Sequence, residues 1–588
     1  MRERFEIADN SLVIYSAAEK KWLYFSNPIR IHIAQNLESV DKVLCAVEKE
    51  IGQNNLHAAG FLSYEASPAF DSALITHAPT RFPLVWFGIF KEPKRISLPS
   101  CVNDSPFHME WESSLSEKEY SQSFQKIKEW IRSGDTYQVN YTFRLRASFS
   151  GDPWQLFLNM IRLQGYGYGA FANIDKWAIC SASPELFFSL EGETLISRPM
   201  KGTVPRGVDL ADDRRQSEKL TKSFKNRAEN VMIVDMVRND MGRVCSDCDV
   251  TVTGLYELEK YPTLWQMTSS VRCVTKSGLK DLLRALFPAA SITGAPKIRT
   301  MQIIADLEST PRQIYTGTIG YFSPGRKSQF NVAIRTVLID KENETAEYGV
   351  GGGIVWDSER RDEFDECYTK AMILTNPPME FELLETILWT TETGLYLLSE
   401  HMERLSGSAS YFSFRIDPVA IINKLEKMVQ KLPGHSHKLR LLVSRNGKIQ
   451  IEAAPIAKLP TPYRVRIAKS PVNSRNPFLY HKTTDRRIYD QARSESPDYE
   501  DLLLWNEQGE MTESCLGNLI VEKAGVLLTP PISCGLLAGT YRSFLLKQGR
   551  IKETVIHKEE LPECSHFYLA NSVRGIWEIF PDLSSILE

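Results

Sequence analysis

Long hydrophobic runs are missing from this chain of 588 residues. No stretch reaches the roughly 18 uninterrupted apolar residues that a membrane helix needs. The opening, MRERFEIADN, is charged, and no apolar stretch behind it resembles a signal peptide. The sequence therefore predicts a cytoplasmic protein.

Cysteine is also scarce, with 10 residues spread over the whole chain. Cysteines this dispersed do not form the disulfide framework of a small secreted domain. Cys245 and Cys248 form a single CxxC pair, but no second pair or nearby histidine completes a zinc site. Ordinary thiols are the favoured interpretation.

Neither sign of charge dominates, because the chain has 70 Lys+Arg and 73 Asp+Glu residues and a net charge of -3. This balance argues against a protein that coats nucleic acid or an anionic membrane. The 43% of hydrophobic and 24% of charged residues are ordinary for globular proteins and exclude a disordered chain. The length allows several domain-sized units.

Proline marks the clearest break in the chain. The segment Thr375-Asn376-Pro377-Pro378 follows a charged helical pattern and precedes the apolar run 381–389. We therefore expect a first domain at 1–375, a linker at 376–380 and a second domain at 381–588.

The first domain mixes helical and strand patterns. Ser116 and Glu119 form a capping box and Gly134 supplies a stop, which predicts a helix between them. Strands are expected at 177–182, 187–190, 331–339 and 347–355, and helices at 213–240 and 359–373. Without a regular βαβ alternation, the pattern favours an α+β fold with large antiparallel sheets.

The second domain is also of mixed class. Strands are expected at 438–444, 463–468 and 501–505, and helices at 399–409 and 418–430.

Three carboxylates of the first domain stand out. Glu229 lies on an apolar helical stripe, and Glu363 and Glu366 are one turn apart on another predicted helix, followed by Lys370. One interpretation is a solvated face with a Glu–Lys pair. The other is an oxygen-only site suited to Mg²⁺, formed where the two helices converge.

Glycines gather just before the second of these helices, in YGVGGGIVWDS, and Gly294 lies in SITGAPK. They could be turns, or they could let backbone N–H groups approach an anion. They do not match the GxGxxG or GxxxxGK[ST] spacings, which disfavours NAD and ATP.

Six strings in the first domain resemble the chorismate-utilising enzymes, a family that includes anthranilate, aminodeoxychorismate, isochorismate and salicylate synthases. They follow the family's order over residues 115–371. The strings are SASPELFF (181–188), RPMKGT (198–203), RAENVMIVDMVRND (227–240), FPAASITGAPK (287–297), FNVAIRT (330–336) and GGGIVWDS with EFDE (351–366). The resemblance implies a chorismate-binding α/β sandwich domain.

Two positions indicate which reaction the resemblance implies. Gln138 stands where the isochorismate and salicylate synthases carry a lysine that activates water, which disfavours water as the nucleophile. Lys201, in PMKGT, stands where anthranilate synthases carry alanine, and it matches the members that aminate chorismate at C4. Without its neighbours, Lys201 would be interpreted as a surface lysine in a turn.

The resemblance also implies roles for the site residues. Glu185 matches the general acid that protonates the C4 hydroxyl, and Lys201 would attack C2 covalently before ammonia enters at C4. Mg²⁺ would be held by Glu229, Glu363 and Glu366. The substrate would be bound by Arg335, Thr293, Gly294 and Gly352.

Some features of the first domain leave questions open. Gln266 stands where many relatives have histidine, so its role is open. No glutamine amidotransferase domain is visible, which implies ammonia from a separate glutaminase subunit. Ser63-Tyr64-Glu65 resembles the region that binds tryptophan in relatives, and the sequence does not decide whether it does so here.

Four strings in the second domain resemble the fold-type IV pyridoxal-phosphate enzymes, which include amino-acid transaminases and aminodeoxychorismate lyase. They are SEHMERLSGSA (399–409), HKTTDRRIYDQA (481–492), TESCLGNLI (512–520) and GLLAGTYR (535–542). The resemblance implies a two-subdomain α/β fold with pyridoxal 5'-phosphate as cofactor. Homodimers are common in this group, so a homodimer through this domain is expected.

The implied roles of the second-domain residues suit that cofactor. Lys482 would carry it covalently and shuttle a proton, and Glu513 would face its pyridine nitrogen. Gly539 and Thr540 start a predicted helix that stops near Gly549, and their N–H groups would bind the phosphate, with charge added by Arg404. Without the neighbouring motifs, Gly539 would more often be interpreted as a turn residue and Arg404 as a solvated surface charge.

Fusion of the two resemblances implies 4-aminobenzoate formation for folate synthesis: amination of chorismate by the first domain and elimination of pyruvate by the second. Three alternatives stay open. The second domain could be an amino-acid transaminase, or a non-catalytic module that docks the glutaminase, and the first could be an anthranilate synthase.

Overall fold

The structure is a computed structural model that describes residues 6–98, 109–165, 167–247, 249–375 and 380–584. Cys248 and most of the expected linker lie outside these residues. The chain divides into two units. Unit 1 is Met1–Pro205 with Ser217–Pro378, and unit 2 is Arg206–Gln216 with Met379–Glu588.

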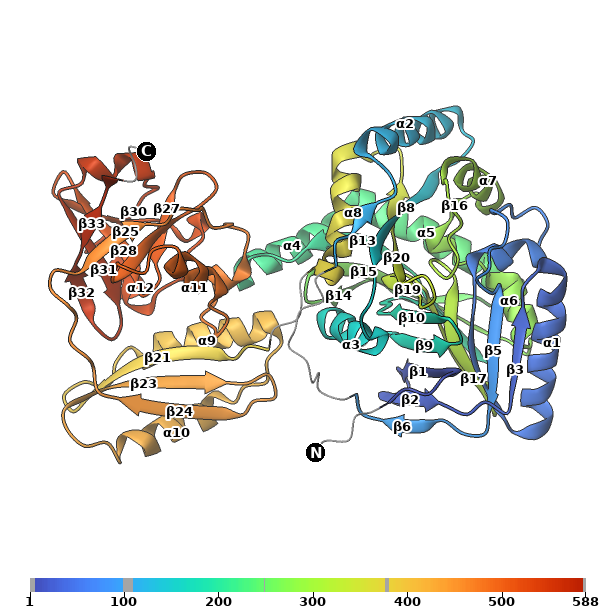
Figure 1. The fold of residues 1–588 in the computed structure, drawn as a ribbon, viewed down its shortest axis with the longest axis horizontal. Helices are drawn as coiled ribbons and strands as arrows, with labels where there is room; N and C mark the ends of the chain where they lie inside the picture. The colour runs from blue at the N-terminus through green and yellow to red at the C-terminus, as the bar shows by residue number, and fades with distance from the viewer. Residues whose placement is uncertain (1–5, 99–108, 166, 248, 376–379, 585–588) are drawn as a thin grey trace. The chain divides into compact units, whose positions relative to one another are not determined.

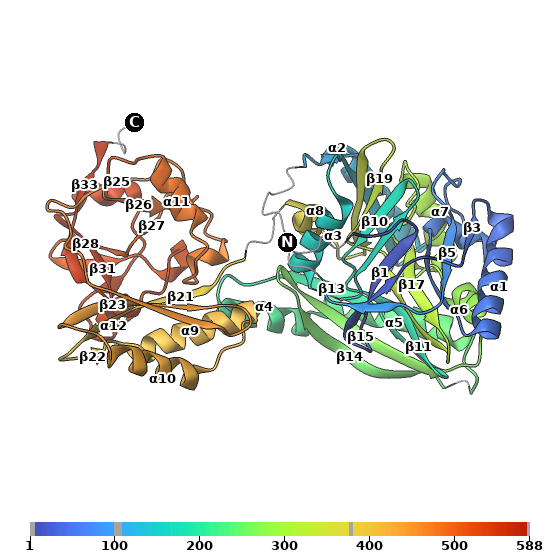
Figure 2. The same cartoon turned by 60° about the horizontal axis from the view of Figure 1, so that its bottom comes forward.

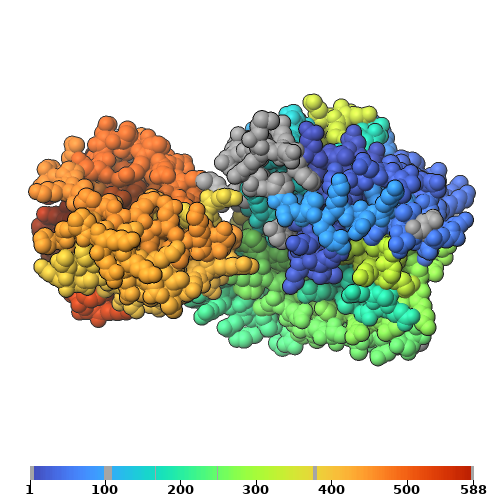
Figure 3. Space-filling model, turned by 90° about the horizontal axis from the view of Figure 1, so that it is seen from below, coloured from blue at the N-terminus to red at the C-terminus, as the bar shows by residue number. Residues whose placement is uncertain are grey.

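Two large sheets form the middle of unit 1, and neighbouring strands pair antiparallel, as β8 with β20 and β11 with β18 do. The first sheet runs in the order β16 (Gly294–Ala295), β8 (Gln138–Ser148), β20 (Thr345–Ile354), β19 (Thr336–Asp340), β10 (Trp177–Ser181), β9 (Ala170–Ile174), β1 (Ser11–Ser16), β2 (Lys21–Phe25) and β6 (Lys94–Ile96), with β7 (Glu112–Ser113) beside β8. Its β2–β6 edge lies at the surface of unit 1 (Figure 3).

The second sheet carries most of the strands that reach the candidate site. Its order is β13 (Met200–Pro205), β15 (Leu264–Val274), β12 (Thr194–Arg198), β11 (Leu186–Glu191), β18 (Lys327–Val332), β17 (Thr318–Ser323), β4 (His57–Leu62), β5 (Val85–Phe90) and β3 (Arg30–Ala34), with β14 (Thr251–Lys260) beside β15.

Helices cover the outer faces of the two sheets, so unit 1 is a four-layer sandwich (Figures 1 and 2). On the second sheet pack α1 (Leu37–Asn54), α5 (Phe224–Gly242) and α6 (Leu279–Leu286). On the first sheet pack α2 (Glu117–Ser133), α3 (Pro153–Gln164), α7 (Lys297–Leu307) and α8 (Arg360–Thr375).

The hydrophobic core between the sheets is formed by side chains that point inward from both. Phe61, Trp86, Ile179 and Leu338 are members of this cluster, and all are buried. Burial of each side chain of this size contributes about 1.5–3 kcal/mol. The expected α+β sandwich with large antiparallel sheets is confirmed.

Local sequence signals explain the helix that begins at the capping box. Ser116 accepts the N–H of Glu119, the Glu119 carboxylate accepts the N–H of Ser116, and Gly134 ends α2 in the left-handed region at φ 83°. This prediction is confirmed.

Two predicted elements are interrupted in the structure. The helix expected at 213–240 is split into α4 (Leu210–Lys222) and α5, because the Ser223 side chain accepts the N–H of Asn226 and caps a new helix. The strand expected at 331–339 is split into β18 and β19 by Arg335, whose φ of 49° does not fit a strand.

Unit 2 has two subdomains, as expected. The smaller is a sheet in the order β22 (Gly394–Leu395), β21 (Leu383–Thr390), β23 (Ser436–Val443) and β24 (Ile449–Ala454), covered by α9 (Leu398–Phe412) and α10 (Pro418–Val429).

The larger subdomain of unit 2 is a mixed sheet, in which β25 pairs parallel with β26 and β27 pairs antiparallel with β28. The order is β30 (Lys552–Glu553), β29 (Val526–Thr529), β28 (Asn518–Lys523), β27 (Met511–Ser514), β26 (Asp501–Trp505), β25 (Arg464–Ile467) and β33 (Phe580–Asp582), while β31 (His566–Asn571) pairs with β28 and β32 (Gly575–Glu578). Its helices include α11 (Arg487–Ser494) and α12 (Thr540–Lys547).

The segment Arg206–Gln216 was expected in the first domain but belongs to unit 2. Arg206 forms an ion pair with Asp213, donates to the carbonyl oxygen of Tyr411 at 2.9 Å and lies 4.4 Å over its ring. The Tyr411 hydroxyl donates to the Gly207 carbonyl at 2.6 Å. These contacts fix the segment within unit 2.

Among the described residues, no helix combines the length and apolar character needed to cross a membrane.

Candidate active site

A cavity of about 130 Å³ opens in unit 1 and brings together residues from distant parts of the sequence. Its walls come from β13, α5, β15, β20, α8 and the segment before β19. Seven of the residues singled out in the sequence line it: Glu185, Lys201, Glu229, Gln266, Arg335, Glu363 and Glu366.

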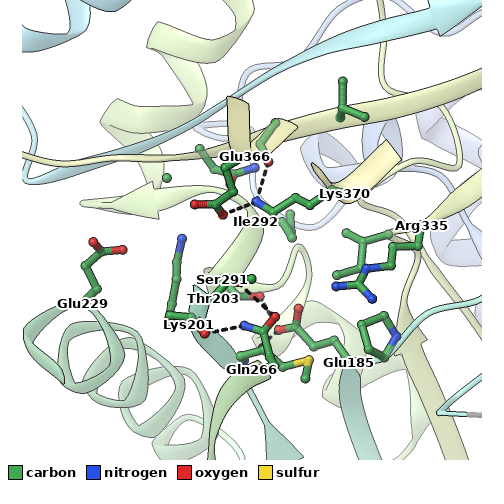
Figure 4. Close-up of a pocket in the computed structure, with 18 of the residues that line it drawn as sticks. Glu185, Lys201, Thr203, Glu229, Gln266, Ser291, Ile292, Arg335, Glu366 and Lys370 are labelled. Atoms are coloured by element: carbon green, nitrogen blue, oxygen red, sulfur yellow. Dashed lines mark hydrogen bonds and ion pairs between the residues drawn. The ribbon is translucent and has the colours of Figure 1, made fainter. Parts of the chain in front are cut away.

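Lys201 projects into this cavity from a bulge in β13. The pairing register shifts between Met200 and Thr203, so one extra residue stands opposite β15. In Figure 4 its amine points into the cavity between Glu229 and Glu366. Burial lowers the pKa of Lys201, although nearby carboxylates oppose that shift. A lower pKa increases the neutral fraction that can act as a nucleophile.

Glu185 lies on the same cavity, just before β11, and is only 3% exposed. Its Oε1 accepts hydrogen bonds from the Ser291 hydroxyl at 2.6 Å and from the Met200 N–H at 3.4 Å. Burial nevertheless raises the pKa of Glu185 to about 7. A carboxyl that stays partly protonated near neutral pH is suited to donate a proton.

Arg335 supplies a buried positive charge to the cavity. It is 7% exposed and lies 5.7 Å over the Tyr261 ring. Among the described residues no carboxylate pairs with its guanidinium. A buried cation without a partner is costly, so an anionic ligand would be favoured beside it.

The three glutamates proposed for Mg²⁺ line one cavity but do not form a closed metal site. Glu363 pairs with Lys225 at 3.1 Å, and Glu366 pairs with Lys370 at 2.7 Å. Burial raises the pKa of Glu229 to about 7. Among the described residues, no group of three or more His, Cys, Asp or Glu side chains is placed to hold an ion.

These glutamates still have the donor chemistry that Mg²⁺ needs. Mg²⁺ is usually bound by one or two protein carboxylates, with water and substrate oxygens completing its octahedron. The carboxylates that line the cavity offer only oxygen ligands and fit this requirement, provided that a ligand supplies further oxygens.

Three of the expected substrate residues lie behind the cavity wall. The Thr293 hydroxyl donates to the carbonyls of Ala289 and Ala290, at 3.3 and 3.2 Å. Gly294 pairs with Val139 in the sheet, and a Cβ there would lie 2.0 Å from the Gln138 carbonyl oxygen. These glycine and threonine positions shape the wall rather than line it.

Gly352 is the third, and it lies in β20 beside the carboxylate wall. A Cβ on it would be 3.3 Å from Glu363 Oε2 and 3.8 Å from the Lys370 amine. Its neighbours Gly351 and Gly353 line the cavity. A Cβ on Gly353 would lie 2.4 Å from the Lys201 amine, so a side chain there would displace the amine.

Sequence reasoning missed several residues that line the cavity. Gln138, which the sequence did single out, lies behind the cavity wall near Gly353, and both its amide atoms are buried without a hydrogen-bond partner among the described residues. Buried amide atoms are usually hydrogen-bonded in native proteins, so this side chain has bonding capacity to spare. The polar lining residues not singled out before include Asn140, Lys225, Asn226, Ser291, Tyr315 and Tyr348. Their polar character alone gave no signal, because nothing in their spacing links them.

The second group of candidate residues lies in unit 2, around Lys482. The Lys482 carbonyl accepts the N–H of Leu384 at 3.0 Å, which fixes the lysine where the two subdomains of the unit meet. Burial, followed by the charge of Arg404, lowers the pKa of Lys482 to about 8. This lysine therefore has an accessible neutral form.

Glu513, on β27, is held by three hydrogen bonds. It accepts from the Tyr489 hydroxyl at 2.8 Å, from the Leu537 N–H at 3.2 Å and from the Asn518 amide at 3.1 Å. Burial raises its pKa to about 7. A buried, oriented carboxyl of this kind fits a basic ring nitrogen as its partner.

Arg404 is tied to a carboxylate that the sequence did not single out. Its guanidinium pairs with both oxygens of Glu385, at 2.9 and 2.6 Å, and donates to the Ala538 carbonyl at 3.1 Å. His401 lies 2.7 Å from the same carboxylate. The ion pair positions Arg404 close to the residue before Gly539.

Gly539 and Thr540 begin α12, as predicted. A Cβ on Gly539 would lie 1.8 Å from the Asn518 Oδ1, so no other residue fits there without displacement. Thr540 is 5% exposed. The free N–H groups of this first turn fit an anionic phosphate. Together with Lys482 and Glu513, they suit a cofactor with a phosphate at one end and a basic ring nitrogen at the other.

The two segments of the chain that carry these sites match two enzyme families. Residues 97–376 match the family described as chorismate binding enzyme, and residues 382–580 match amino-transferase class IV. An anthranilate synthase component I from Streptococcus pneumoniae shares the fold of unit 1, with a TM-score of 0.51 and 22% identity over 64% of this chain and 95% of that chain.

The most similar curated relatives include aminodeoxychorismate synthase component 1 of Salmonella typhimurium, which is 41% identical over 46% of this chain and 61% of that protein. A solved protein of Mesorhizobium loti, named provisionally as an amino-acid aminotransferase, is 33% identical over 34% of this chain and 100% of that chain, with a TM-score of 0.33.

Residues 97–376 are therefore similar to the chorismate binding enzymes and residues 382–580 to the class IV amino-transferases. The chain spans about three-fifths of the length of the Salmonella relative. The match to the class IV amino-transferases implies pyridoxal phosphate as the cofactor of unit 2.

Proposed function

We propose that the protein converts chorismate to 4-aminobenzoate in two reactions. Unit 1 aminates chorismate to 4-amino-4-deoxychorismate, and unit 2 removes pyruvate from that product. The similarity to aminodeoxychorismate synthase component 1 supports the first reaction. The union of the two families in one chain supports the second.

The observation that carries the first assignment is the buried amine of Lys201, which faces a cavity lined by the partly protonated carboxyl of Glu185. The two groups supply a nucleophile and a proton donor. Displacing a ring hydroxyl needs both, because hydroxide is a poor leaving group.

In the first step, a new bond from the lysine nitrogen to C2 forms while the bond from C4 to oxygen breaks. The Lys201 nitrogen bonds to C2, the C1=C2 double bond moves to C1=C6, and the C5=C6 double bond moves to C4=C5. The C4–O bond breaks, and the oxygen takes the Glu185 proton and leaves as water. The proton lost by the lysine nitrogen restores Glu185.

The second step reverses this shift with ammonia as the nucleophile. Ammonia bonds to C4, the double bonds return, and the C2–N bond to Lys201 breaks. The proton that ammonia loses passes to Lys201, which leaves as a free amine. Covalent catalysis thus divides one difficult substitution into two allylic ones.

Charged groups around the cavity suit the substrate's two carboxylates. Arg335 would bind one of them, because its guanidinium has no carboxylate partner among the described residues. Mg²⁺ held by Glu229, Glu363 and Glu366 would bind the other and supply charge neutralisation. Thr293, Gly294 and Gly352 support the wall behind these groups.

In unit 2, pyridoxal phosphate supplies an electron sink when bound. Lys482 would carry it, Glu513 would hold its ring nitrogen, and Gly539, Thr540 and Arg404 would surround its phosphate. Lys482 is then placed to take the proton from C4 of the aminated ring. The C3–O bond breaks, the ring becomes aromatic, and the released enolate takes a proton at its CH2 carbon to give pyruvate.

The proposal also includes partners. Ammonia would come from a separate glutaminase subunit, and unit 2 would mediate a homodimer. A second candidate function for unit 2 is amino-acid transamination, which the Mesorhizobium loti relative favours by its name.

One incubation tests these assignments. The purified chain is mixed with chorismate, Mg²⁺, pyridoxal phosphate and ammonium, and the aromatic products are separated by chromatography. We expect 4-aminobenzoate with equimolar pyruvate. In Lys482→Ala the aminated intermediate accumulates instead, which also excludes a merely docking role for unit 2.

Other outcomes would contradict parts of the proposal. Anthranilate as the product would overturn the role of Lys201. Accumulation of the intermediate by the unmodified chain would reassign unit 2, and turnover of an amino acid with 2-oxoglutarate would then identify it as a transaminase.

A further inference from the structure

Gln266 lies on β15 directly opposite the bulge that carries Lys201. Thr203 is its register partner, and the extra residue of the bulge falls between Met200 and Thr203. Gln266 is 7% exposed and lines the cavity. A bulge beside a site commonly changes the direction of one side chain, but it needs other contacts to hold it.

Both ends of the Gln266 amide contact this bulge. Its Nε2 donates to the Gly202 carbonyl at 3.0 Å, and its Oε1 accepts from the Thr203 hydroxyl at 3.1 Å. Figure 4 shows the amide lying beneath the backbone of Lys201. We call these two hydrogen bonds the Gln266 clamp.

The backbone of the bulge is unusual and needs this support. Gly202 has φ 93°, a conformation that favours glycine, and a Cβ there would lie 3.1 Å from Asn226. On the other side, Asn230 donates to the Lys201 carbonyl at 3.5 Å and accepts from the Ser269 hydroxyl at 2.6 Å. Gln266 of β15 and Asn230 of α5 therefore hold the bulge at two consecutive carbonyl groups.

We propose that Gln266 is a positioning residue that aims the Lys201 amine at the reacting carbon through its clamp on Gly202 and Thr203. This inference rests on the proposed amination reaction. Gln266 acts through the backbone of the bulge, because both ends of its amide are already bonded there.

The bulge also explains why small displacements would matter. The Lys201 amine passes close to Gly353, where a Cβ would be only 2.4 Å away. Reacting atoms must approach to about 3–3.5 Å with the correct alignment. A bulge freed from Gln266 would spread the amine over several directions, which lowers the rate without removing the groups that bind substrate.

The test uses the full chain and follows the covalent adduct of Lys201 with chorismate, without ammonium, by intact mass. The adduct is expected to increase the mass of the protein by the mass of chorismate minus that of water. In Gln266→Leu we expect its rate of formation to fall by about 10- to 30-fold, because two neutral hydrogen bonds are lost, while the concentration of chorismate for half-maximal rate changes less than about twofold.

Partner variants distinguish the clamp from general packing. Thr203→Val should slow the adduct, and Thr203→Ser, which keeps the hydroxyl, should restore most of the rate. In the double variant Gln266→Leu/Thr203→Val, adduct formation should be slowed by less than the two single slowing factors multiplied together, because both substitutions remove the same hydrogen bond.

A matched control is available in the same unit. Gln329 is also buried, accepts the Ala17 N–H at 2.9 Å and donates to the Tyr15 carbonyl at 2.6 Å, with no part in the cavity lining. Gln329→Leu should lower stability but leave the adduct rate within about twofold. Equal slowing of both leucine variants would overturn the proposal.

A second readout separates this proposal from the proposed function. Labelling of Lys201 by a small acylating reagent, without chorismate, is measured by peptide mass spectrometry. A severalfold change in the labelling rate of Lys201 in Gln266→Leu, but not in Gln329→Leu, supports the clamp. This holds even if the unmodified chain forms no adduct with chorismate, because a missing adduct contradicts only the amination reaction. Unchanged labelling together with an unchanged adduct rate would overturn the clamp.

Discussion

Burial gives Lys201 and Glu185 the properties that the proposed reaction needs. Desolvation disfavours the charged form of both groups, so the pKa of the lysine falls and that of the carboxyl rises to about 7. Burial therefore increases the neutral fraction of both the amine and the acid. A solvent-exposed lysine and glutamate would both be charged and unsuited to these roles.

Lys201→Ala tests the nucleophile. Without the amine, the covalent route to C4 is closed, so we expect C4 amination to fall by about two orders of magnitude or more. Any residual product should be aminated at C2. Chromatography of the products measures both, and Lys222→Ala, which changes an exposed lysine, serves as the control. An unchanged rate and product would rule out the covalent role.

Glu185→Gln tests the proton donor. Because the acid must be protonated, adduct formation on Lys201 should decline as pH rises through about 7, the pKa to which burial raises Glu185. We expect the glutamine variant to be slower by about 10²- to 10⁴-fold and to lose this alkaline decline. Adduct rates from pH 5.5 to 9 provide the measurement, with Glu191→Gln as the control. An alkaline decline that persists in the slow variant would assign it to another group.

At the scale of elements, the local signals in the sequence predicted structure wherever a cap or an apolar period was complete. The capping box at Ser116 set the start of α2, and Gly539 set the start of α12. Ser223 was missed as a cap because the helical period continues on both sides of it. Arg335 was missed as a break because its φ of 49° depends on tertiary contacts rather than on its neighbours in sequence.

Candidate site residues were predictable only where a motif carried them. Lys201 and Glu185 lie in strings of recognisable composition, whereas Lys225 and Glu385 gain their importance from their ion pairs with Glu363 and Arg404. Such pairs join residues far apart in the chain, and no spacing rule encodes them. Burial, which sets the pKa values, is likewise a property of the assembled sheets.

The start of α12 offers a test at this scale. Gly539→Ala would place a Cβ 1.8 Å from the Asn518 Oδ1, and Asn518 also donates to Glu513. We expect the dissociation constant of pyridoxal phosphate to rise by about tenfold or more, equivalent to about 1.4 kcal/mol. Absorbance titration with the cofactor measures it. Gly407→Ala, at a position with open space around it, should bind normally; an equal loss there would show a general effect of helix glycines.

At the scale of the whole molecule, buried carboxyls make stability depend on pH. Burial raises the pKa of Glu65, Glu185, Glu229 and Glu513 from 4.5 to about 7. Between these values the unfolded chain releases protons that the folded chain keeps, so the free energy of unfolding falls as pH rises. The loss is about 3 kcal/mol for each group.

Denaturant unfolding of the ligand-free protein at pH 5 and pH 7.5 tests this prediction. The free energy of unfolding should be lower at pH 7.5, and the difference should be smaller in Glu185→Gln, which cannot ionise. Greater stability of the unmodified chain at pH 7.5 than at pH 5 would contradict the sign, and an unchanged difference in the variant would remove Glu185 from the set.

The assignment of Arg206–Gln216 to unit 2 also constrains how the chain is made. Translation adds about 5–20 residues per second. Arg206 therefore leaves the ribosome about 10–40 seconds before Tyr411, the residue whose ring and carbonyl it contacts in the folded unit. During that interval the segment has no completed surface to join, although β13 before it and helix α5 after it have already been synthesised. Folded unit 2 thus includes a segment, Arg206–Gln216, that is synthesised long before the rest of the unit.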